Sequence, residues 1–533
     1  MNIPAHSPTA LAPRGATGDI GTAPRRQLRI VLAGALLAMV LASLDQNIVN
    51  TALPRIAGDL GGMAHLSWVV TAFMLTSTTT TPLYGKLSDI YGRRALFFVA
   101  ILGFLAGSLL CGAAQSMGQL IAFRAVQGLG AGGLLVLAQA AVGDVVSPRE
   151  RPHYQGLFTG AFALCSVAGP LLGGLITSAL SWRWVFYVNL PVGVLALVMI
   201  AIGLRNPPSG KVQPIDYIGA LLLTGATTAL LLLLAWGGTE FGWRSLDCVV
   251  LAAGTAALIG LFVWREGVAP EPLIRLALFR NPVFARGVAV GGMMAFAMLG
   301  STVFLPLYFQ LVLGMDPTMA GVMMLPQVTG MLLTSVVGGR LVSRLGRNKP
   351  FLLTGLGLEV IALASLAAFA FFAASAPVFL VSMGALGLGM GLGMPNLTTA
   401  VQNAVAHREL GAATGTMTFA RSLGGALGVA ASGSIMTARL AAAFAGSGGS
   451  AGELTQHGMR ALAHIAPAQQ AEVAAAYRTA LTGCFLLSAM VMTAAFILVL
   501  GLPEQMLRSE IEDAPRTDDL IMRSPASPAT KTI

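Results

Sequence analysis

Fourteen apolar runs of about 18 or more residues follow one another along this chain, and they limit its fold more than any other feature. A helix of about 20 residues spans the hydrocarbon core of a bilayer. Only 10% of the residues are charged, whereas roughly 25% are charged in soluble domains. The runs are centred near residues 39, 76, 105, 136, 167, 195, 230, 258, 296, 329, 362, 389, 425 and 490. The sequence therefore predicts an all-α integral membrane protein with 14 transmembrane helices.

The positive charges lie mostly on one side of this predicted topology. Of the 32 Lys and Arg residues, 24 lie in the two tails and in alternate loops, and six lie in the other loops. The remaining two, Arg124 and Arg421, lie inside apolar runs. Loops rich in Lys and Arg stay in the cytoplasm. We therefore expect both termini to be cytoplasmic, and we attribute the net charge of +10 to topology and not to nucleic-acid binding.

A ten-residue segment recurs in the chain, first after the second apolar run and again after the tenth. Four of its residues, Gly85, Leu87, Gly92 and Arg93, have identical counterparts 254 positions later. Same-sense repeats of this kind build two-lobed secondary transporters, whose substrates bind between the lobes near the midplane of the membrane. Matching run 2 with run 10 predicts two six-helix lobes and an extra two-helix hairpin between them.

The predicted domain boundaries follow from this match. We expect a disordered cytoplasmic tail at 1–28, the first lobe at 29–205, a linker with the extra hairpin at 206–270, the second lobe at 271–503, and a second disordered cytoplasmic tail at 504–533. Within the second lobe, a Gly/Ser/Ala-rich loop at about 439–478 is expected to face the outside.

The first apolar run contains a carboxylate, Asp45, well inside the predicted span. A charge at that depth costs roughly 2.5–3.5 kcal/mol on insertion scales and usually marks an ion or substrate path. Polar residues near it, including Asn47 and Asn50, indicate that this part of the helix faces a cavity or other helices. Arg124 in the fourth run requires a carboxylate or carbonyls, and Asp45 is the obvious acid in the same half. The alternatives are a structural Asp45 hydrogen-bonded to a neighbouring helix, and an Arg124 that extends to the membrane boundary.

The second half contains two further ionisable residues inside apolar runs, Glu359 and Arg421. Glu359 is either a second proton site or a protonated carboxyl hydrogen-bonded between helices, and the sequence supports both readings equally. Arg421 is a second intramembrane cation.

The loop between the second and third runs combines an acid with glycines and basic groups: Gly85, Asp89, Gly92, Arg93 and Arg94. Ordinary cytoplasmic loops need neither the glycines nor the acid. A charge cluster that pairs with a neighbouring helix in one conformation only would act as a gate. The alternative is that these charges only anchor the loop at the membrane surface.

The fifth run contains Gly169, Pro170, Gly173 and Gly174. Proline removes a backbone hydrogen bond, and small residues let two helices approach closely. The segment therefore predicts a bendable helix in close contact with a partner, with ordinary packing glycines as the alternative.

The sequence patterns that suggest an enzyme or a cofactor site lie in the wrong structural context. The pattern at Gly128, Gly130 and Gly133 fits a dinucleotide fingerprint, but it follows an apolar helix and not a strand, so we interpret it as close helix packing. A nucleophile-elbow pattern near Ser450 lies in a low-complexity loop. The sequence contains no P-loop, no His-Glu-x-x-His and no cysteine pair with metal-ligand spacing. We expect no catalysis, no cofactor and no metal site.

Together these motifs resemble the major facilitator superfamily and, within it, the fourteen-span drug:proton antiporter family. The resemblance covers residues 30–502 and rests on the segments 44–54, 85–94, 124–128, 169–174, 182–193 and 421–425. Three departures are Asn47, where the family usually has Thr, Cys165, where it often has Gly, and Glu359, which belongs to no family motif.

The resemblance implies a multidrug efflux permease in the inner (cytoplasmic) membrane of a bacterium. Its substrates would be small amphiphilic compounds, cationic or neutral, exported in exchange for protons by alternating access. A periplasmic adaptor is an optional partner. The alternatives are a lipid or metabolite exporter of the same fold and, outside transport, a membrane-embedded sensor or scaffold, which no loop here is long enough to support.

Each candidate residue receives a role in this reading. Proton coupling is assigned to Asp45, Arg124 and Glu359, the conformational gate to Gly85, Asp89, Gly92, Arg93 and Arg94, the antiporter motif to Gly169, Pro170, Gly173 and Gly174, and the substrate cavity to Asn47, Asn50, Gln127 and Arg421.

The charge distribution makes one prediction about topology. Reporter fusions should place the turn near Gly238 outside the cytoplasm, and the two ends of the extra hairpin, near Asp216 and Glu266, inside it. A cytoplasmic signal from the turn would contradict the predicted topology.

Overall fold

The computed structural model describes residues 25–60, 66–204, 216–237, 242, 245–444, 467–504 and 507, and these residues are mostly helical. The first part contains α1 (Arg25–Leu60), α2 (Leu66–Tyr91), α3 (Arg93–Ala113), α4 (Met117–Val145), α5 (Arg151–Ala179), α6 (Trp184–Tyr187) and α7 (Asn189–Gly203). The pair α8 (Tyr217–Trp236) and α9 (Leu246–Val268) follows.

The second part contains two short 3-10 helices, η2 (Leu276–Arg280) and η3 (His407–Glu409), and eight α-helices. These are α10 (Pro282–Thr302), α11 (Leu305–Leu311), α12 (Pro317–Val322), α13 (Leu325–Leu345), α14 (Lys349–Phe371), α15 (Ala376–Asn403), α16 (Leu410–Phe444) and α18 (Pro467–Leu500). Every predicted span centre lies inside one of the helices of the described chain.

Twelve helical segments in the described part of the chain are long and apolar enough to cross a membrane. Of the long helices, α2 and α16 do not meet this measure, because α2 contains a run of threonines and α16 is rich in Gly, Ser and Thr. By length and composition the structure therefore supports about 12 spans, where the apolar runs alone predicted 14.

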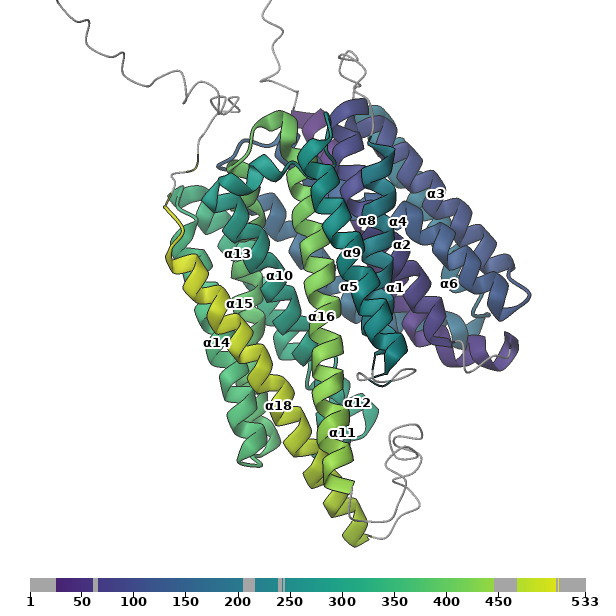
Figure 1. Cartoon of the computed structure of the whole chain (residues 1–533), viewed down its shortest axis with the longest axis vertical. Helices are drawn as coiled ribbons and strands as arrows, with labels where there is room; N and C mark the ends of the chain where they lie inside the picture. Colours follow the sequence, from purple (N-terminus) through teal and green to yellow (C-terminus); the bar gives the residue numbers. More distant parts are fainter. Residues whose placement is uncertain are drawn as a thin grey trace, which may run out of the picture.

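The helices assemble into two bundles, as Figure 1 shows. In the first lobe α2 and α3 pack on α4, and α5 and α7 pack on α1. In the second lobe α10 packs on α16, while α13 and α14 pack on α15, and α14 also packs on α18. Each lobe has its own apolar core, represented by Phe97 and Phe104 in the first and by Phe284, Phe379 and Phe485 in the second.

The two copies of the internal repeat both lie where the lobes meet. Gly85 in α2 faces α16, and a Cβ there would collide with the carbonyl oxygen of Gly411. Gly339 in α13 faces α5, and a Cβ there would collide with the carbonyl oxygen of Pro152. The repeated glycine therefore serves the same purpose twice, because it lets a helix of one lobe approach the backbone of the other.

The lobes are joined at the end of the bundle where α1 begins and α18 ends, which we call the terminal end (Figure 1). Arg149 donates to the carbonyl oxygens of Ser343 and Arg344 at 3.0 Å each, and Arg151 donates to Asn403 Oδ1 at 2.7 Å. Within the described residues, the hydrogen bonds and ion pairs between the lobes all lie toward this end. The structure is thus closed at its terminal end.

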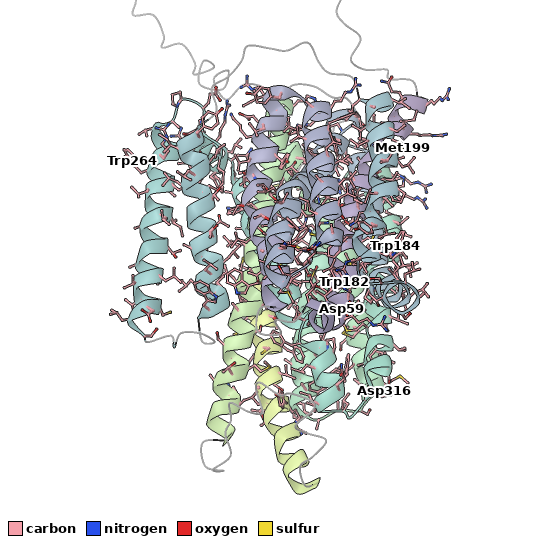
Figure 2. The ribbon with its side chains drawn as sticks, turned by 90° about the vertical axis from the view of Figure 1, so that its right-hand side faces the viewer. Asp59, Trp182, Trp184, Met199, Trp264 and Asp316 are labelled. Carbon is pink, nitrogen blue, oxygen red and sulfur yellow. The ribbon has the colours of Figure 1, made fainter. Side chains whose placement is uncertain are left out.

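The α8–α9 pair lies beside the seam between the lobes and contacts α2 and α16. The rings of Trp68 in α2 and Trp236 in α8 meet edge to face, with centroids 5.8 Å apart. An ion pair of 3.0 Å between Arg265 and Asp216 joins the two ends of the pair. Figure 2 shows this pair to one side of the bundle, where Trp264 is 65% exposed, as suits a lipid-facing surface.

Several predicted boundaries differ from the structure or lie outside it. Helix α1 already begins at Arg25, inside the predicted tail, and Gln27 there donates to the carbonyl oxygen of Gly203. Helices α16 and α18 extend into the predicted loop at 439–478, and residues 445–466 lie outside the described residues. The same holds for the turn at Gly238, for residues 1–24 and for most of the tail after Glu504.

Candidate functional site

A polar cluster is sealed inside the first lobe around Asp45 of α1. Asp45 is 0% exposed and Arg124 of α4 is 1% exposed. Arg124 Nη1 donates to Asp45 Oδ2 at 2.7 Å. Gln127 Nε2 and Asn189 Nδ2 donate to Asp45 Oδ1 at 2.9 and 2.7 Å. The carboxylate therefore accepts three hydrogen bonds, one of them from a cation, from two other helices.

The surrounding helices hold the donors in place. Arg124 Nη1 also donates to Gln127 Oε1 at 2.7 Å, and its guanidinium carbon lies 4.0 Å from the ring centroid of Phe73 in α2. Asn189 also donates to Ser108 Oγ in α3 at 3.0 Å, and Ser108 donates to the carbonyl oxygen of Phe186. The guanidinium thus has a carboxylate, an amide and an aromatic face as partners, as a buried cation requires.

The sequence predicts that Asp45 and Arg124 are partners, but it gives no role to Asn189. This residue begins α7 directly after the short helix α6, and its side chain is 2% exposed. A single amide at the start of an otherwise apolar helix was the available signal. Its partner across the lobe depends on how α7 packs against α1 and α3, which the sequence does not reveal.

Three of the predicted cavity residues lie in different surroundings. Gln127 is fully buried in the Asp45 cluster, so it does not line an open cavity in this conformation. Asn47 is partly buried and donates to the carbonyl oxygen of Ser43 in its own helix at 2.7 Å. Asn50 is exposed. The cluster thus incorporates Gln127 and leaves the two asparagines outside it.

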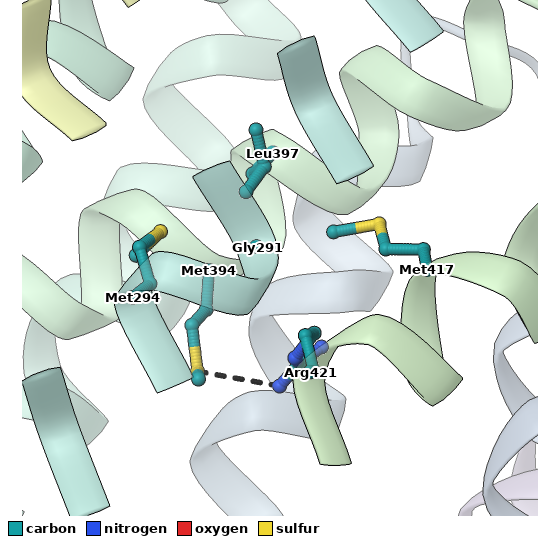
Figure 3. A pocket seen from close by; sticks show the side chains of 6 residues that line it. All are labelled: Gly291, Met294, Met394, Leu397, Met417 and Arg421. Carbon is teal, nitrogen blue, oxygen red and sulfur yellow. Dashed lines mark hydrogen bonds between the residues drawn. The ribbon is translucent and has the colours of Figure 1, made fainter. Parts of the chain in front are cut away.

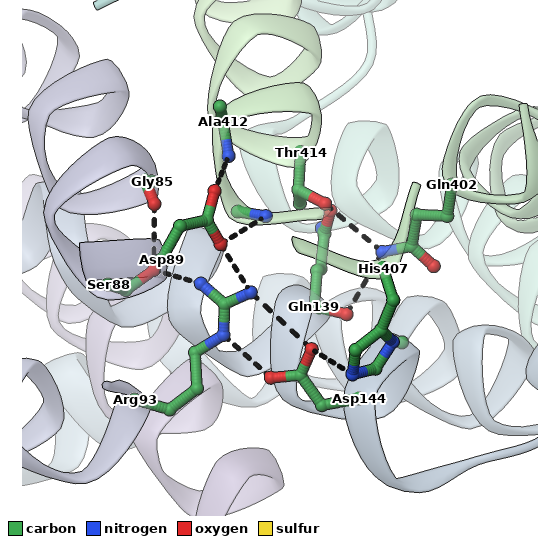
Figure 4. A network of polar contacts seen from close by, with 12 residues as sticks. Gly85, Ser88, Asp89, Arg93, Gln139, Asp144, Gln402, His407, Ala412 and Thr414 are labelled. Carbon is green, nitrogen blue, oxygen red and sulfur yellow. Dashed lines mark hydrogen bonds and ion pairs between the residues drawn. The ribbon is translucent and has the colours of Figure 1, made fainter. Parts of the chain in front are cut away.

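The predicted gate forms a second polar cluster at the terminal end (Figure 4). Asp89 accepts hydrogen bonds from the backbone N–H groups of Gly411 and Ala412 at 2.9 and 2.7 Å, at the start of α16. Arg93 forms ion pairs of 2.7 Å with both Asp89 and Asp144. A carboxylate at a helix N-terminus is favoured by the helix dipole. Asp89 therefore joins the first lobe to the second electrostatically.

The other gate residues surround this contact. Gly92 has a φ of 86°, a conformation that glycine adopts without strain, and it connects α2 to α3 within one residue. Arg94 forms no ion pair in the described part of the chain, and its guanidinium lies 6.0 Å from the ring centroid of Phe98. Of the loop's predicted residues, Gly85 and Asp89 thus make the contact between the lobes.

A cluster of four charged residues continues the closure, and Glu271 at its centre lies outside the membrane-spanning helices. Lys86 Nζ lies 2.9 Å from Glu271 Oε2, and Arg275 binds both Glu271 and Glu409. Burial alone would raise the pKa of Glu271, but the hydrogen bond from Lys86 and the charges of Lys86 and Arg275 outweigh it and lower that pKa below its usual range. The Glu271 carboxylate therefore stays charged and keeps the segment between α9 and η2 attached to α2.

The predicted antiporter motif lies on α5, which is continuous through Pro170. A Cβ on Gly169 would collide with Asn47 of α1, and one on Gly173 would lie 2.9 Å from the carbonyl oxygen of Ile48. A Cβ added to Gly174 would meet no atom of another helix within 4 Å, and Pro170 is exposed. Two of the glycines therefore make the close contact between α5 and α1.

The glycines of the dinucleotide-like pattern on α4 confirm the packing interpretation. A Cβ on Gly128 would collide with Thr76 of α2, and one on Gly130 would collide with the backbone of α3. A Cβ on Gly133 would lie 2.8 Å from Ala100 of α3 and from the ring of Tyr84 in α2. Among the described residues, no group of three or more His, Cys, Asp or Glu side chains could hold a metal ion.

Glu359 and Arg421 lie apart from any ion pair in the described part of the second lobe. Glu359 in α14 is 1% exposed, and its Oε1 has no hydrogen-bond partner among the described residues. The alternative that Glu359 is hydrogen-bonded to a neighbouring helix is therefore not supported at Oε1. Arg421 in α16 is partly buried and lines a small pocket with Gly291, Met294, Met394, Leu397 and Met417 (Figure 3).

Comparisons with known proteins give the family and the fold. The family model described as Major Facilitator Superfamily matches residues 35–429. The chain is 38% identical to the multidrug transporter protein MdtP of Bacillus subtilis over 417 residues, 77% of this chain and 75% of the relative. It is 34% identical to the efflux pump FUS6 of Gibberella moniliformis over 411 residues, 75% of this chain and 72% of the relative. The solved structure of the proton:xylose symporter XylE covers 91% of this chain and 98% of its own, with a TM-score of 0.58 and 14% identity, which shows a shared fold.

The Asp45 cluster makes a prediction about stability. Arg124→Ala leaves a buried carboxylate without its cation, and breaking such a pair costs roughly 3–5 kcal/mol. The double variant Asp45→Leu/Arg124→Met removes both charges, so it should unfold at a higher temperature than Arg124→Ala does. Thermal unfolding of the purified protein in detergent measures both, with the exposed Arg439→Ala as the control. Losses that simply add in the double variant would show that the two residues are not coupled.

Proposed function

The chain belongs to the Major Facilitator Superfamily, and from this premise we propose that it exports small amphiphilic organic compounds in exchange for protons. The Asp45 cluster carries the proposal, because it places a titratable carboxylate and a cation inside the membrane-spanning part of one lobe. The relatives named as a multidrug transporter and an efflux pump support the direction of transport and the substrate class. The transport function needs no catalytic residue and no cofactor.

Proton binding at Asp45 would require the cluster to rearrange. Both carboxylate oxygens already accept hydrogen bonds from Arg124, Gln127 and Asn189. A proton on Asp45 removes the negative charge that holds Arg124 and turns one acceptor into a donor. Because these donors belong to α4 and α7, protonation would loosen their attachment to α1. This links proton uptake to a change in helix packing.

The gate at the terminal end would open and close in the other half of the transport cycle. If the termini are cytoplasmic, the contact of Asp89 with α16 closes the path to the cytoplasm, and the structure represents the state closed on that side. Opening to the cytoplasm would separate α2 from α16 and break these hydrogen bonds. Glu359 is a second candidate proton site, since it is buried without a charged partner among the described residues.

Further features of the proposal concern topology and location. We propose that α2 and α16 also cross the membrane, which gives 14 spans with α8 and α9 as the extra hairpin of the drug:proton antiporter type. Both helices have the length of a span, 26 and 35 residues, and both lie packed within the bundle. We place the protein in the cytoplasmic membrane of a bacterium with both termini inside. A periplasmic adaptor is an optional partner.

The energetics suffice for a useful gradient. Moving one charge through 100 mV is worth about 2.3 kcal/mol. A tenfold concentration ratio corresponds to about 1.4 kcal/mol. One exchanged proton could therefore support roughly a 40-fold substrate gradient.

The sharpest test of the proposal is Asp45→Asn, which mimics the protonated acid permanently. Proteoliposomes with an imposed pH gradient should accumulate a neutral fluorescent amphiphile with wild-type protein and fail to do so with the variant. Substrate-induced proton release from the purified protein should disappear as well. Asp247→Asn, an exposed acid at the start of α9, is the matched control. If Asp45→Asn pumps and releases protons normally, Asp45 is a structural acid and Glu359 becomes the next candidate. Movement of lipids instead of the amphiphile would favour a lipid exporter.

A second test addresses the gate. Asp89→Asn keeps the size of the side chain but loses the charge that attracts the start of α16 and Arg93. We expect slower or unbalanced exchange between conformations, measured as a reduced transport rate, with the substrate dissociation constant nearly unchanged. Glu150→Gln, an exposed acid at the same end, should have no effect. Lost binding with an unchanged exchange rate would contradict the gate assignment.

A further inference from the structure

The pocket around Arg421 combines one cation with an apolar wall. Its lining comes from three helices of the second lobe: Gly291 and Met294 of α10, Met394 and Leu397 of α15, and Met417 and Arg421 of α16. Figure 3 shows the six residues converging, with the guanidinium at one side. Half of the lining is methionine, whose flexible and polarizable side chain adapts to ligands of varied shape.

The guanidinium of Arg421 lacks the partners that a cation in a membrane protein requires. Among the described residues its one hydrogen bond goes to the sulfur of Met394 at 3.4 Å. A thioether sulfur is a weak acceptor, and a guanidinium has five N–H donors. No carboxylate in the described part of the chain lies within ion-pair distance of it. The contrast with Arg124, which has a carboxylate at 2.7 Å, is complete.

The two acids inside the spans, Asp45 and Glu359, do not form an ion pair with Arg421. Asp45 belongs to the other lobe, is 0% exposed and already binds Arg124. Glu359 Oε1 lies on the side of Gly393, where a Cβ would be 3.0 Å from it and 2.7 Å from the methyl of Met294. Met294 therefore lies against both the carboxyl of Glu359 and the pocket of Arg421, and no ion pair forms. The net charge that the pocket presents to a ligand is positive.

We propose that this pocket binds the anionic headgroup, a carboxylate or sulfonate, of an amphiphilic organic substrate. The assignment rests on the proposed export function and specifies its substrate class. A guanidinium binds a planar carboxylate or a sulfonate through paired N–H donors, while a cation there would be repelled. Methionine side chains would contact the adjoining apolar part of the ligand. Arg421 is partly exposed, so the second lobe does not enclose its donors completely.

Gly291 adjoins the pocket, which has no room for a water-sized molecule in this conformation, so a ligand enters only when the lining side chains move. A Cβ on Gly291 would lie 3.4 Å from Cγ of Arg421, 3.5 Å from Cε of Met417 and 3.6 Å from Cδ2 of Leu397. A single methyl group would fit, but a larger side chain would press on the stem of Arg421 and on Met417 and Leu397. Gly291→Leu thus blocks the pocket without removing the charge.

This inference changes the expectation for substrate charge. The resemblance to the drug:proton antiporter family implied cationic or neutral substrates. In the structure the Asp45 carboxylate is buried and paired with Arg124, while the uncompensated charge at Arg421 is positive. Anionic amphiphiles should therefore bind more tightly than cationic ones of the same size.

The test compares three probes with one aromatic body: naphthalene-2-sulfonate, 2-naphthyltrimethylammonium and the neutral naphthalene-2-methanol. Equilibrium dialysis against the purified full-length protein in detergent, corrected with empty micelles, gives each dissociation constant. Wild type should bind the sulfonate at least about tenfold more tightly than the ammonium probe. Arg421→Gln should remove that preference, which corresponds to about 1.4 kcal/mol. Arg421→Lys should keep most of it, because the charge remains.

Two further variants make the result specific to the pocket. Gly291→Leu should weaken sulfonate binding although Arg421 is intact. Arg439→Gln removes an exposed arginine of the same helix and should change nothing. Gel filtration would show whether Arg421→Gln is unfolded. In that case Arg421→Lys and Gly291→Leu test whether the pocket binds the sulfonate.

Equal affinity of wild type for the sulfonate and the ammonium probe would overturn the assignment. So would unchanged sulfonate binding in both Arg421→Gln and Gly291→Leu. These measurements need no pH gradient and no transport, so they are independent of Asp45. Charge-selective binding with no proton-driven transport would reject the export function and keep the anion pocket, and the reverse outcome would reject the pocket alone.

Discussion

The buried ion pair between Asp45 and Arg124 is the interaction on which the first lobe depends. Removing two charges from water is costly, and the pair is stable only because its remaining donors and acceptors are satisfied. Gln127, Asn189 and the face of Phe73 supply what the pair itself cannot. Together with Asp45 these groups come from four helices, so the pair holds α1, α2, α4 and α7 in their mutual positions.

The two lobes treat their internal charges differently. In the first lobe acid and base meet directly and are sealed from solvent. In the second lobe Glu359 and Arg421 remain apart, with Met294 next to both. An internal repeat relates the lobes in sequence, and its matching residues lie at their terminal end. Deeper in the bundle the two lobes differ in how their internal charges are partnered.

Contact between the lobes depends on glycine as much as on charge. Gly85 and Gly339 occupy equivalent places in the repeat, and each permits backbone contact with the opposite lobe. The repeat differs at one residue that contacts the opposite lobe, because Asp89 corresponds to Ser343. Asp89 binds the first backbone amides of α16, whereas the carbonyl oxygen of Ser343 accepts from Arg149. The contact at Asp89 places a carboxylate at a helix N-terminus, whereas the contact at Ser343 does not. Neutralising a side chain should therefore weaken the Asp89 contact and leave the Ser343 carbonyl contact unchanged.

The sequence by itself determined the helical membrane class, the repeat and the candidates Asp45 and Arg124, because apolar run length and a charge within such a run each have few physical solutions. The sequence could not determine whether α2 and α16 cross the membrane, because these two long helices are less apolar than the other spans. Tertiary structure alone decided that Asn189 binds Asp45, that Gln127 is buried and that Arg421 has no carboxylate partner in the part of the chain that the structure describes. Partners of a side chain depend on which helices become neighbours, and no local pattern around Asn189 or Arg421 records that.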